Sequence, residues 1–336
     1  MLNHFMILLS KQLWRLISAL FWLGLWLFGL GVSFWYILRW WPGDRLLFVR
    51  LGNYFMPWLL IGLIPGLLMA GLAWRKGLMM TLALPTLMIG FTFAPLFLPR
   101  SNPVFASSDS LKVMSYNIWG RNQNMSAIAE LIKQEQPDML LLQELSPRAA
   151  RSLMPELAHL YPDSKLHFAY EPQTYQGIIS RYPLTPLKAS LQGSRTQSVS
   201  VETPSGPITV WNVHTAQPWP WSRQYRQFSK LAKAVASIDG PLIVGGDFNT
   251  TDQSDAYHLV AQHLGNAHWE AGWGFGFSFP APARPIRGHS LLTLPPAVRI
   301  DHIFHSHHFF TRSARTLAES GGSDHFPVIA EFSQVR

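Results

Sequence analysis

The sequence predicts an α/β domain that is preceded by three transmembrane helices. The first 105 residues contain three long apolar runs without a charge. From residue 111 onward, short apolar runs alternate with segments of helical periodicity, which is typical of an α/β domain. Several of these short runs end in a carboxylate, an amide or an imidazole. We therefore expect a membrane region over residues 1–105 and a separate α/β domain over residues 106–336.

The three apolar runs cover residues 16–38, 51–74 and 77–98. Each exceeds the roughly 20 residues that a helix needs to cross a bilayer. Trp40, Trp41 and Trp74 stand at the ends of these runs, where interfacial aromatic residues are common. The first run is too long for a signal peptide, and no small-residue cleavage pattern follows it. Three membrane-spanning helices are therefore expected.

The positive charge of the chain belongs to the membrane region. Residues 1–105 hold eight basic residues and one acidic residue, whereas the rest holds 19 basic and 18 acidic residues. Basic residues that flank apolar spans favour membrane insertion. A nucleic-acid-binding face would place the excess on the soluble part. The charge distribution therefore gives little support to a nucleic acid partner.

The orientation follows from the basic residues beside the spans. The turn Arg75–Lys76, together with Lys11 and Arg15, favours a cytoplasmic N-terminus, although three arginines between residues 39 and 50 oppose this. Three spans would then place the catalytic domain on the extracytoplasmic (periplasmic) side. The chain has no cysteine, which excludes disulfides, thiolate metal sites and cysteine nucleophiles.

The remaining elements follow in chain order. Residues 99–110 are rich in proline and serine and predict a linker, and residues 266–296 predict a long loop. Strands are expected at residues 111–117, 138–145, 176–181, 199–202, 208–214, 241–244, 298–304 and 324–332, and helices at residues 125–134, 222–238 and 254–264.

The stretch IVGGDFNT, residues 243–250, predicts a buried strand that breaks into a tight turn at two glycines. Ligands bind at strand ends of this kind in open α/β sheets. Asp247 and Asn249 are two residues apart and would face the same side in an extended backbone. The alternative is a hairpin turn in which these two residues make only local hydrogen bonds.

Six predicted strands present polar residues at their ends, which suggests convergence on one site. Several carboxylates at one place repel each other and require a cation. Oxygen ligands of this kind suit Mg²⁺, Mn²⁺ or Ca²⁺. The residues are Asn117, Glu144, His214, Asp247 with Asn249, Asp301, and Asp324 with His325.

The motifs SYNIW, LLQEL, NVHT, VGGDFN, RIDHIF and GGSDHFPVIAEF, in this order, closely resemble the endonuclease/exonuclease/phosphatase superfamily. The resemblance covers about residues 111–334 and leaves the membrane region outside. It implies a four-layer α/β sandwich, in which two packed mixed β-sheets are flanked by helices. It also implies hydrolysis of phosphate esters with Mg²⁺ or Mn²⁺.

The resemblance assigns the metal to three residues. Glu144 would be the principal ligand, with Asn117 and Asp324 nearby. This set of oxygen donors suits a hard divalent cation.

The resemblance also assigns catalytic roles. Asp247 would orient or deprotonate the attacking water, and Asn249 would hold a phosphate oxygen. Asp301 and His325 would form an acid–imidazole pair on the phosphate. His214 would donate to a phosphate oxygen or assist the leaving group. Phosphoryl transfer needs an in-line nucleophile, neutralised charge and leaving-group help, which these roles supply.

Other residues admit two interpretations. Arg181 would either bind substrate phosphate or form a surface ion pair. The four histidines at positions 302, 305, 307 and 308 would be solvated strand-end residues rather than a metal site. Trp219, Trp221 and Tyr225 would pack against a helix, or stack on a base or a lipid interface.

The sequence thus predicts a membrane-anchored, divalent-metal-dependent phosphoesterase that acts on a phosphodiester or phosphomonoester. The membrane anchor and the aromatic residues favour a lipid or another envelope phosphate ester. The alternatives are a membrane-tethered nuclease, a non-catalytic module that binds a phosphorylated ligand, and a membrane scaffold. No protein partner is indicated by any motif.

Overall fold

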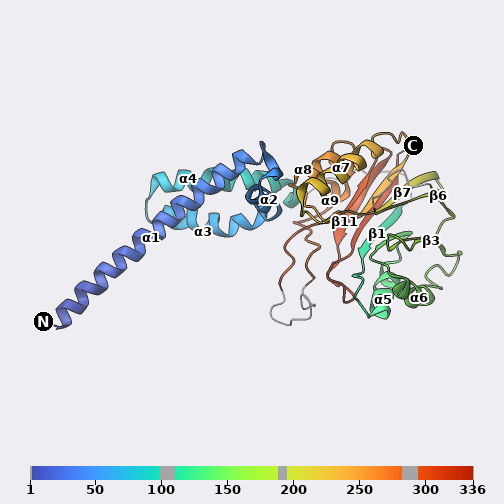
Figure 1. Ribbon diagram of the computed structural model, residues 1–336, viewed down its shortest axis with the longest axis horizontal. Helices are drawn as coiled ribbons and strands as arrows, with labels where there is room; N and C mark the ends of the chain where they lie inside the picture. The colour runs from blue at the N-terminus through green and yellow to red at the C-terminus, as the bar shows by residue number, and fades with distance from the viewer. Residues whose placement is uncertain (1, 99–109, 188–194, 282–293, 336) are drawn as a thin grey trace. The chain divides into compact units, whose positions relative to one another are not determined.

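The computed structural model describes residues 2–98, 110–187, 195–281 and 294–335 of the chain (Figure 1). The chain divides into two compact units, Met1–Pro95 and Leu96–Arg336. The predicted linker over residues 99–110 lies outside the described residues, except for Ser110.

The N-terminal unit consists of apolar helices. Two of them are long and apolar enough to cross a membrane, Leu9–Leu38 within α1 (Leu2–Leu38) and Lys76–Phe97 within α4 (Lys76–Phe93) and η3 (Ala94–Phe97). These correspond to the first and third predicted spans. The segment between them begins with the short η1 (Gly43–Arg45).

The second predicted span, residues 51–74, is not one straight helix. α2 (Leu47–Tyr54) and the helix Met56–Leu72, which comprises η2 (Met56–Trp58) and α3 (Leu59–Leu72), are bent by 77°. Pro57 follows the break, and a proline has no backbone N–H with which to continue an α-helical ladder. Among the described residues, a third span exists only if this bent pair acts as one.

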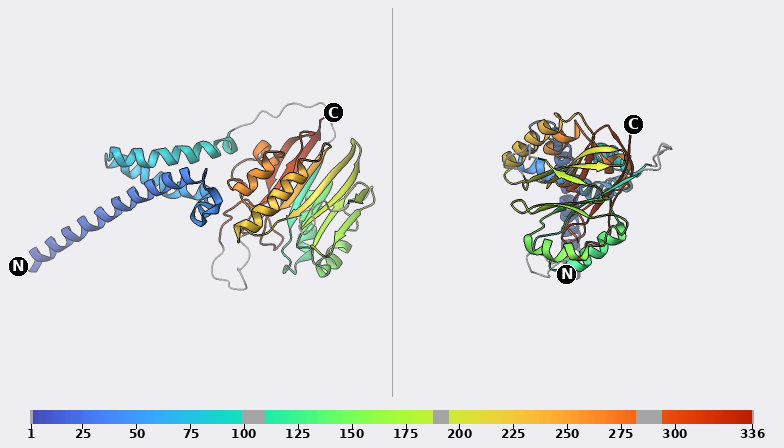
Figure 2. Two further views of the ribbon diagram at one scale, coloured as in Figure 1. Left: turned by 45° about the horizontal axis from the view of Figure 1, so that its top comes forward. Right: turned by 90° about the vertical axis from the view of Figure 1, so that its right-hand side faces the viewer.

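Two six-stranded mixed sheets form the C-terminal unit, and Figure 2 shows them face to face. The first has the order β11 (Phe309–Thr316), β12 (Val328–Gln334), β1 (Leu111–Asn117), β2 (Met139–Gln143), β4 (Gln176–Ser180), β3 (His167–Glu171). The second has the order β5 (Leu184–Pro186), β6 (Thr196–Thr203), β7 (Gly206–His214), β8 (Leu242–Asp247), β10 (Asp301–His305), β9 (Gly265–Asn266).

Helices cover the outer face of each sheet, which confirms the four-layer sandwich (Figures 1 and 2). α5 (Met125–Glu135) and α6 (Pro147–Glu156) pack on the first sheet. α7 (Trp221–Val235) and α8 (Asp255–Ala261) pack on the second, near the short α9 (Ala267–Ala271). A third apolar core lies between the two sheets.

Six elements of the C-terminal unit have no counterpart among the predicted ones, and two of them, β9 and α9, stand at the start of the predicted long loop, residues 266–296. α6 carries prolines at both ends and a largely polar, alanine-rich sequence, so its apolar stripe is short. β3 and β5 are brief, and β11 is largely half-buried with a register irregularity between Thr311 and Ser313. Each therefore lacks the alternation of apolar and polar residues on which strand prediction depends. Part of the predicted long loop, residues 282–293, lies outside the described residues.

Three buried amides connect the two sheets, and we call them the inter-sheet amide network: Gln143 on β2, Gln176 on β4 and Asn212 on β7. Gln143 Nε2 donates to Asn212 Oδ1 at 2.7 Å, and Gln176 Nε2 donates to the Asn212 carbonyl at 2.7 Å. Asn212 Nδ2 donates in turn to the carbonyls of Leu142 and Gly177 on the first sheet. Hydrogen bonds thus join β2 and β4 to the facing strand β7.

The two glycines of β8 allow close approach on both sides of the strand. A Cβ at Gly245 would lie 2.6 Å from the side chain of Leu141 in the facing sheet. Gly246 has a φ of 155°, and a Cβ there would lie 1.8 Å from the carbonyl oxygen of Val213 on β7. Position 246 therefore needs a glycine for two reasons, because its φ is disfavoured for other residues and because a Cβ has no room there.

We expect Gly246→Ala to destabilise the C-terminal unit by more than about 3 kcal/mol, because the new methyl group collides with backbone and adopts a disfavoured φ. The matched control is Gly240→Ala, since a Cβ at Gly240 meets nothing within 4 Å. Thermal unfolding of the full chain in detergent, followed by circular dichroism, should show a midpoint lowered by roughly 6 °C or more for Gly246→Ala alone. Equal midpoints for the two variants would contradict this explanation.

Candidate active site at one edge of the two sheets

Strand pairing in the second sheet aligns three of the predicted residues. β8 runs parallel to β7 and antiparallel to β10, and Asp247 is the register partner of both His214 and Asp301. Asp301 therefore begins its strand whereas His214 and Asp247 end theirs. The three side chains reach the same edge because β10 runs in the opposite direction.

The first sheet supplies the facing half of the site. β1 runs parallel to β2, with Asn117 paired to Gln143, and antiparallel to β12, with Ser115 paired to Val328. The ends of β1 and β2 therefore meet the segment that precedes β12. This segment carries Asp324 and His325, and the residue after β2 is Glu144.

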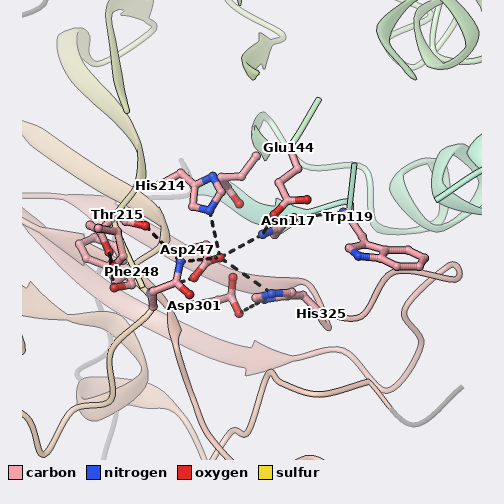
Figure 3. Close-up of polar contacts among 12 residues, drawn as sticks. Asn117, Trp119, Glu144, His214, Thr215, Asp247, Phe248, Asp301 and His325 are labelled. Carbon is pink, nitrogen blue, oxygen red and sulfur yellow. Dashed lines mark hydrogen bonds and ion pairs between the residues drawn. The ribbon is translucent and has the colours of Figure 1, made fainter. Parts of the chain in front are cut away.

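Asp247 lies at the centre of the site and has only 1% of its surface exposed (Figure 3). Its Oδ2 accepts a hydrogen bond of 3.0 Å from Asn117 Nδ2 of the other sheet. The same oxygen lies 3.6 Å from His214 Nε2 and 3.8 Å from His325 Nε2. A carboxylate that is surrounded by donors in a dry environment is well placed to orient a small polar molecule.

Asn249 is held beside Asp247 in the left-handed region, with a φ of 46°. Its backbone N donates to Asp247 Oδ1 at 2.8 Å, and its Nδ2 lies 3.3 Å from Asp247 Oδ2 and 3.1 Å from the Thr215 carbonyl. The local hydrogen bonds of the turn interpretation are therefore present. The turn is not a hairpin, because the next element is the helix α8.

Asp301 and His325 form a buried pair. His325 Nδ1 lies 2.9 Å from Asp301 Oδ2, and the backbone N of Asp301 donates to Ser278 Oγ at 3.2 Å. Burial acts to lower the pKa of His325, but the carboxylates of Asp301 and Asp247 outweigh it and raise the pKa to about 10. His325 is therefore a cation at neutral pH, with Nδ1 directed at Asp301 and Nε2 at the centre of the site.

Glu144 adopts a left-handed φ of 59° immediately after β2. Its Oε2 accepts a hydrogen bond of 2.7 Å from the backbone N of Gly120, and its Oε1 lies 3.5 Å from Asn117 Nδ2. The carboxylate is half-buried and remains in contact with a cavity. The strained backbone thus directs an acid toward the opening of the site.

Asp324 is an acidic residue with an unsatisfied oxygen in the site. Burial, together with the smaller effects of Glu144 and Asp247, raises its pKa to about 6 against the lowering effect of His325. Its Oδ1 is buried and has no hydrogen-bond partner among the described residues. A divalent cation near Glu144, Asn117 and Asp324 would satisfy this oxygen and relieve the repulsion, so the donor set fits the predicted metal.

A second group of potential ligands lies close by. One ligand atom each from Asp247, Asp301 and His325 fall within 4.8 Å of one another. His325 is cationic there and already paired with Asp301, so it disfavours a bound metal. The group around Glu144 is the better fit.

His214 and Asn249 face a cavity of about 540 Å³ that Glu144 also lines. The Nδ1 atom of His214 is buried and has no hydrogen-bond partner among the described residues. This imidazole therefore has an unused polar atom at the border of the site.

The structure does not bring Arg181 into the site, so its predicted role in substrate binding lacks support. Arg181 follows β4, which runs antiparallel to β2, and its backbone N donates to the carbonyl of Asp138 before β2 begins. Arg181 thus lies at the opposite end of β2 from Glu144. Its Nε lies 3.3 Å from Asp138 Oδ1, which corresponds to the ion-pair alternative.

Two of the four clustered histidines are core residues rather than solvated ones. His302 is buried, and its Nε2 lies 2.9 Å from the carbonyl of Thr250. Burial, followed by the nearby Arg299, lowers its pKa to about 4, so this imidazole is neutral. His305 Nε2 lies 2.7 Å from Glu270 Oε2.

Of the three aromatic residues that follow His214, one lines the cavity and two stack on each other in α7. Trp219 is 49% exposed at its edge, whereas Trp221 and Tyr225 stack on each other at 4.8 Å within α7. Packing on a helix therefore describes the latter pair.

The cavity is also lined by four basic residues that the motifs did not identify: Arg195, Arg223, Arg226 and Lys230. The helical spacing of the last three was the available signal, because residues three and four apart share one face of a helix.

Comparisons with known proteins agree with this geometry. A family described as the Endonuclease/Exonuclease/phosphatase family matches residues 114–325, which is more than half of the chain. A search of curated proteins gave no match.

Solved structures share the fold. An endonuclease/exonuclease/phosphatase family protein from Bacteroides thetaiotaomicron has a TM-score of 0.53 at 16% identity, covering 68% of this chain and 99% of that one. A corresponding protein from Bacteroides vulgatus has a TM-score of 0.53 at 19% identity, covering 68% and 100%. D. rerio TDP2, solved with a single-strand DNA product, has a TM-score of 0.53 at 16% identity, covering 68% and 100%.

Proposed function

Because this chain belongs to the endonuclease/exonuclease/phosphatase family, whose members are metal-dependent phosphoesterases and nucleases, we propose that it is a membrane-anchored hydrolase of phosphate esters. The observation that carries the proposal is the arrangement around Asp247. A cationic imidazole, a donor amide from the opposite sheet and an acidic cluster with an unpartnered oxygen surround one buried carboxylate.

Glu144, Asn117 and Asp324 would hold Mg²⁺ or Mn²⁺. When bound, such an ion neutralises charge that develops on the phosphate oxygens. The buried Oδ1 of Asp324 and the half-buried carboxylate of Glu144 support this set over the group around His325.

Asp247 would position the attacking water and take its proton at Oδ2. Asn117 Nδ2 and the backbone N of Asn249 hold the carboxylate in a single orientation, which leaves little reorganisation for the reaction. Its burial excludes competing water from this acceptor.

His325 would donate from Nε2 to a phosphate oxygen, because Asp301 occupies Nδ1. A donor that is already charged and already oriented acts most strongly on the charge of the transition state. Asn249 and His214, which face the cavity, would hold a second phosphate oxygen and the leaving group.

For the substrate we propose a lipid or another envelope phosphate ester, either a diester or a monoester. The apolar N-terminal helices support an association with the membrane, which brings the catalytic domain close to such molecules. A membrane-tethered nuclease is the second candidate, because D. rerio TDP2, which shares the fold, was solved with a single-strand DNA product. The assembled set of catalytic residues argues against a non-catalytic binding module.

Hydrolysis should require a divalent metal. We expect purified full-length protein in detergent to lose turnover of a chromogenic phosphodiester in chelator and to regain it with Mg²⁺ or Mn²⁺. Glu144→Gln should weaken metal binding by 10-fold or more, roughly, because it removes the charge of the principal ligand. Glu130→Gln, on the exposed face of α5, is the matched control. Full turnover in chelator would refute the mechanism.

The Asp301–His325 pair should act as a unit. We expect His325→Ala to lower kcat by roughly 10²-fold or more with a smaller change in KM, because its charge acts mainly in the transition state. Asp301→Asn should lose less, and the double variant should fall well short of the product of the two losses.

The measurement is a double-mutant cycle on rate constants, with circular dichroism to confirm folding. His159→Ala, an exposed histidine outside the site, controls for loss of an imidazole. Fully multiplicative losses would show that the two residues do not cooperate.

With the bent pair of α2 and the helix Met56–Leu72 acting as a third span, the catalytic domain would lie on the extracytoplasmic side. The basic turn at Arg75–Lys76, at the start of α4, supports this orientation. A reporter that is active only outside the cytoplasm, fused after Arg336, should be active, and a reporter that is active only inside should be silent. The reverse pattern would place the domain in the cytoplasm.

A further inference from the structure

The cavity beside the site is lined by two chemically different groups of residues. Glu144, His214 and Asn249 belong to the candidate active site. The second group consists of four basic side chains, which we call the cationic wall: Arg195, Arg223, Arg226 and Lys230. Because one continuous cavity of about 540 Å³ contains both, a single small molecule can contact the wall and the reacting centre together.

Within the described residues, no acidic side chain neutralises the charges of the cationic wall. In the described part of the chain, none of its four side chains has a carboxylate oxygen within 4.0 Å. Five described basic residues elsewhere in the domain have such a partner, as in the pairs Lys112–Glu331 and Arg315–Glu135, whereas others, including Lys233, do not; the wall differs in that its four unpaired cations line one cavity. Four like charges around one cavity repel each other, and an anionic ligand would relieve this repulsion.

The helix α7 fixes most of the wall in place. Arg223, Arg226 and Lys230 follow one another at intervals of three and four residues and form one face. The opposite face, which includes Phe228 and Leu231, is buried in the core on the second sheet. The wall therefore belongs to a packed helix, so its position is set by the core.

A buried glutamine connects this helix to the active-site loop. Gln224 Nε2 donates to the carbonyl of Asn249 at 2.8 Å and to the carbonyl of Ala216 at 3.1 Å. Arg195 joins through its own backbone, since its carbonyl accepts from the N of His214 at 2.8 Å. The wall is thus held directly beside two of the residues that face the substrate.

We propose that the cationic wall binds a second phosphate group of the substrate, while the first lies at the catalytic centre. This inference rests on the proposed function and narrows it to compact esters that carry at least two phosphate groups. A cavity of this size suits a headgroup or a sugar phosphate. A nucleic acid strand instead requires a basic groove that follows its backbone, and the domain as a whole carries almost no net charge.

The test uses full-length protein in detergent and two chromogenic probes that differ by one phosphate. These are the 4-nitrophenyl ester of thymidine 5′-phosphate and the same ester with a 3′-phosphate. The double variant Arg226→Gln/Lys230→Gln should lose roughly tenfold or more in kcat/KM on the second probe, mainly through KM, because it removes charge-assisted contacts. On the first probe it should stay within about twofold of the wild type.

Lys233→Gln is the matched control, because Lys233 lies on the same helix and is exposed but does not line the cavity. It should behave as the wild type on both probes. Equal losses of the double variant on both probes, or no loss on either, would overturn the inference.

A binding measurement separates this inference from the proposed function. Calorimetric titration with inorganic pyrophosphate, without divalent metal, requires no turnover. The double variant should bind roughly tenfold more weakly than the wild type and Lys233→Gln. If the wild type hydrolyses neither probe yet shows this difference, the proposed reaction fails and the anion site stands. Equal affinities for pyrophosphate overturn the anion site.

Two further ligands identify the source of the second phosphate. A lipid with two phosphates in mixed micelles and its deacylated headgroup carry the same charge, so the ratio of their kcat/KM values separates a lipid source from a soluble one. Whichever ligand is preferred, the cationic wall is supported if the double variant lowers kcat/KM on that ligand. A single-stranded oligonucleotide that binds more tightly than pyrophosphate, with the same sensitivity to the double variant, would overturn the compact substrate in favour of a nuclease.

Discussion

The site depends on the burial of one carboxylate at the junction of two sheets. Asp247 has His214 and Asp301 as register partners in its own sheet and accepts from Asn117 of the other. A buried, isolated carboxylate is costly unless donors and cations surround it. The cationic His325, together with the amide of Asn117 and the backbone of Asn249, provides these partners. The neighbouring residues are therefore needed to keep the Asp247 carboxylate buried, in addition to any role in the reaction.

The sequence carried most of the candidate site because strand ends can be recognised locally. An apolar run followed by a polar residue is visible at Asn117, Glu144, His214 and Asp247 without knowledge of the fold. The sequence does not show at which edge of a sheet a strand ends, because that depends on whether the strand pairs in parallel or antiparallel. Arg181 also follows an apolar run, but β4 is antiparallel to β2 and carries it to the far edge.

Two other features could not be predicted from the net charge or the mean apolarity of a segment. The almost neutral charge of the soluble part argued against a basic surface, yet four cations gather at one cavity, which Glu144 also lines. Mean apolarity likewise predicted one helix over residues 51–74, although a helix also needs an unbroken hydrogen-bond ladder, which is interrupted before Pro57. Both properties depend on the arrangement of residues in space.

The inter-sheet amide network has a consequence for how the enzyme would fail. The first sheet carries Asn117 and Glu144, and the second carries Asp247, so the site exists only while the sheets keep one alignment. Aliphatic packing tolerates small in-plane shear, whereas the bonds of Gln143 and Asn212 are satisfied at a single offset. Side chains on one face of a strand recur every two residues, about 6.6 Å, so no equivalent set of bonds lies close to the native offset. Shear of one sheet on the other would therefore break these hydrogen bonds before a new set could form, and the residues of the site would separate with them.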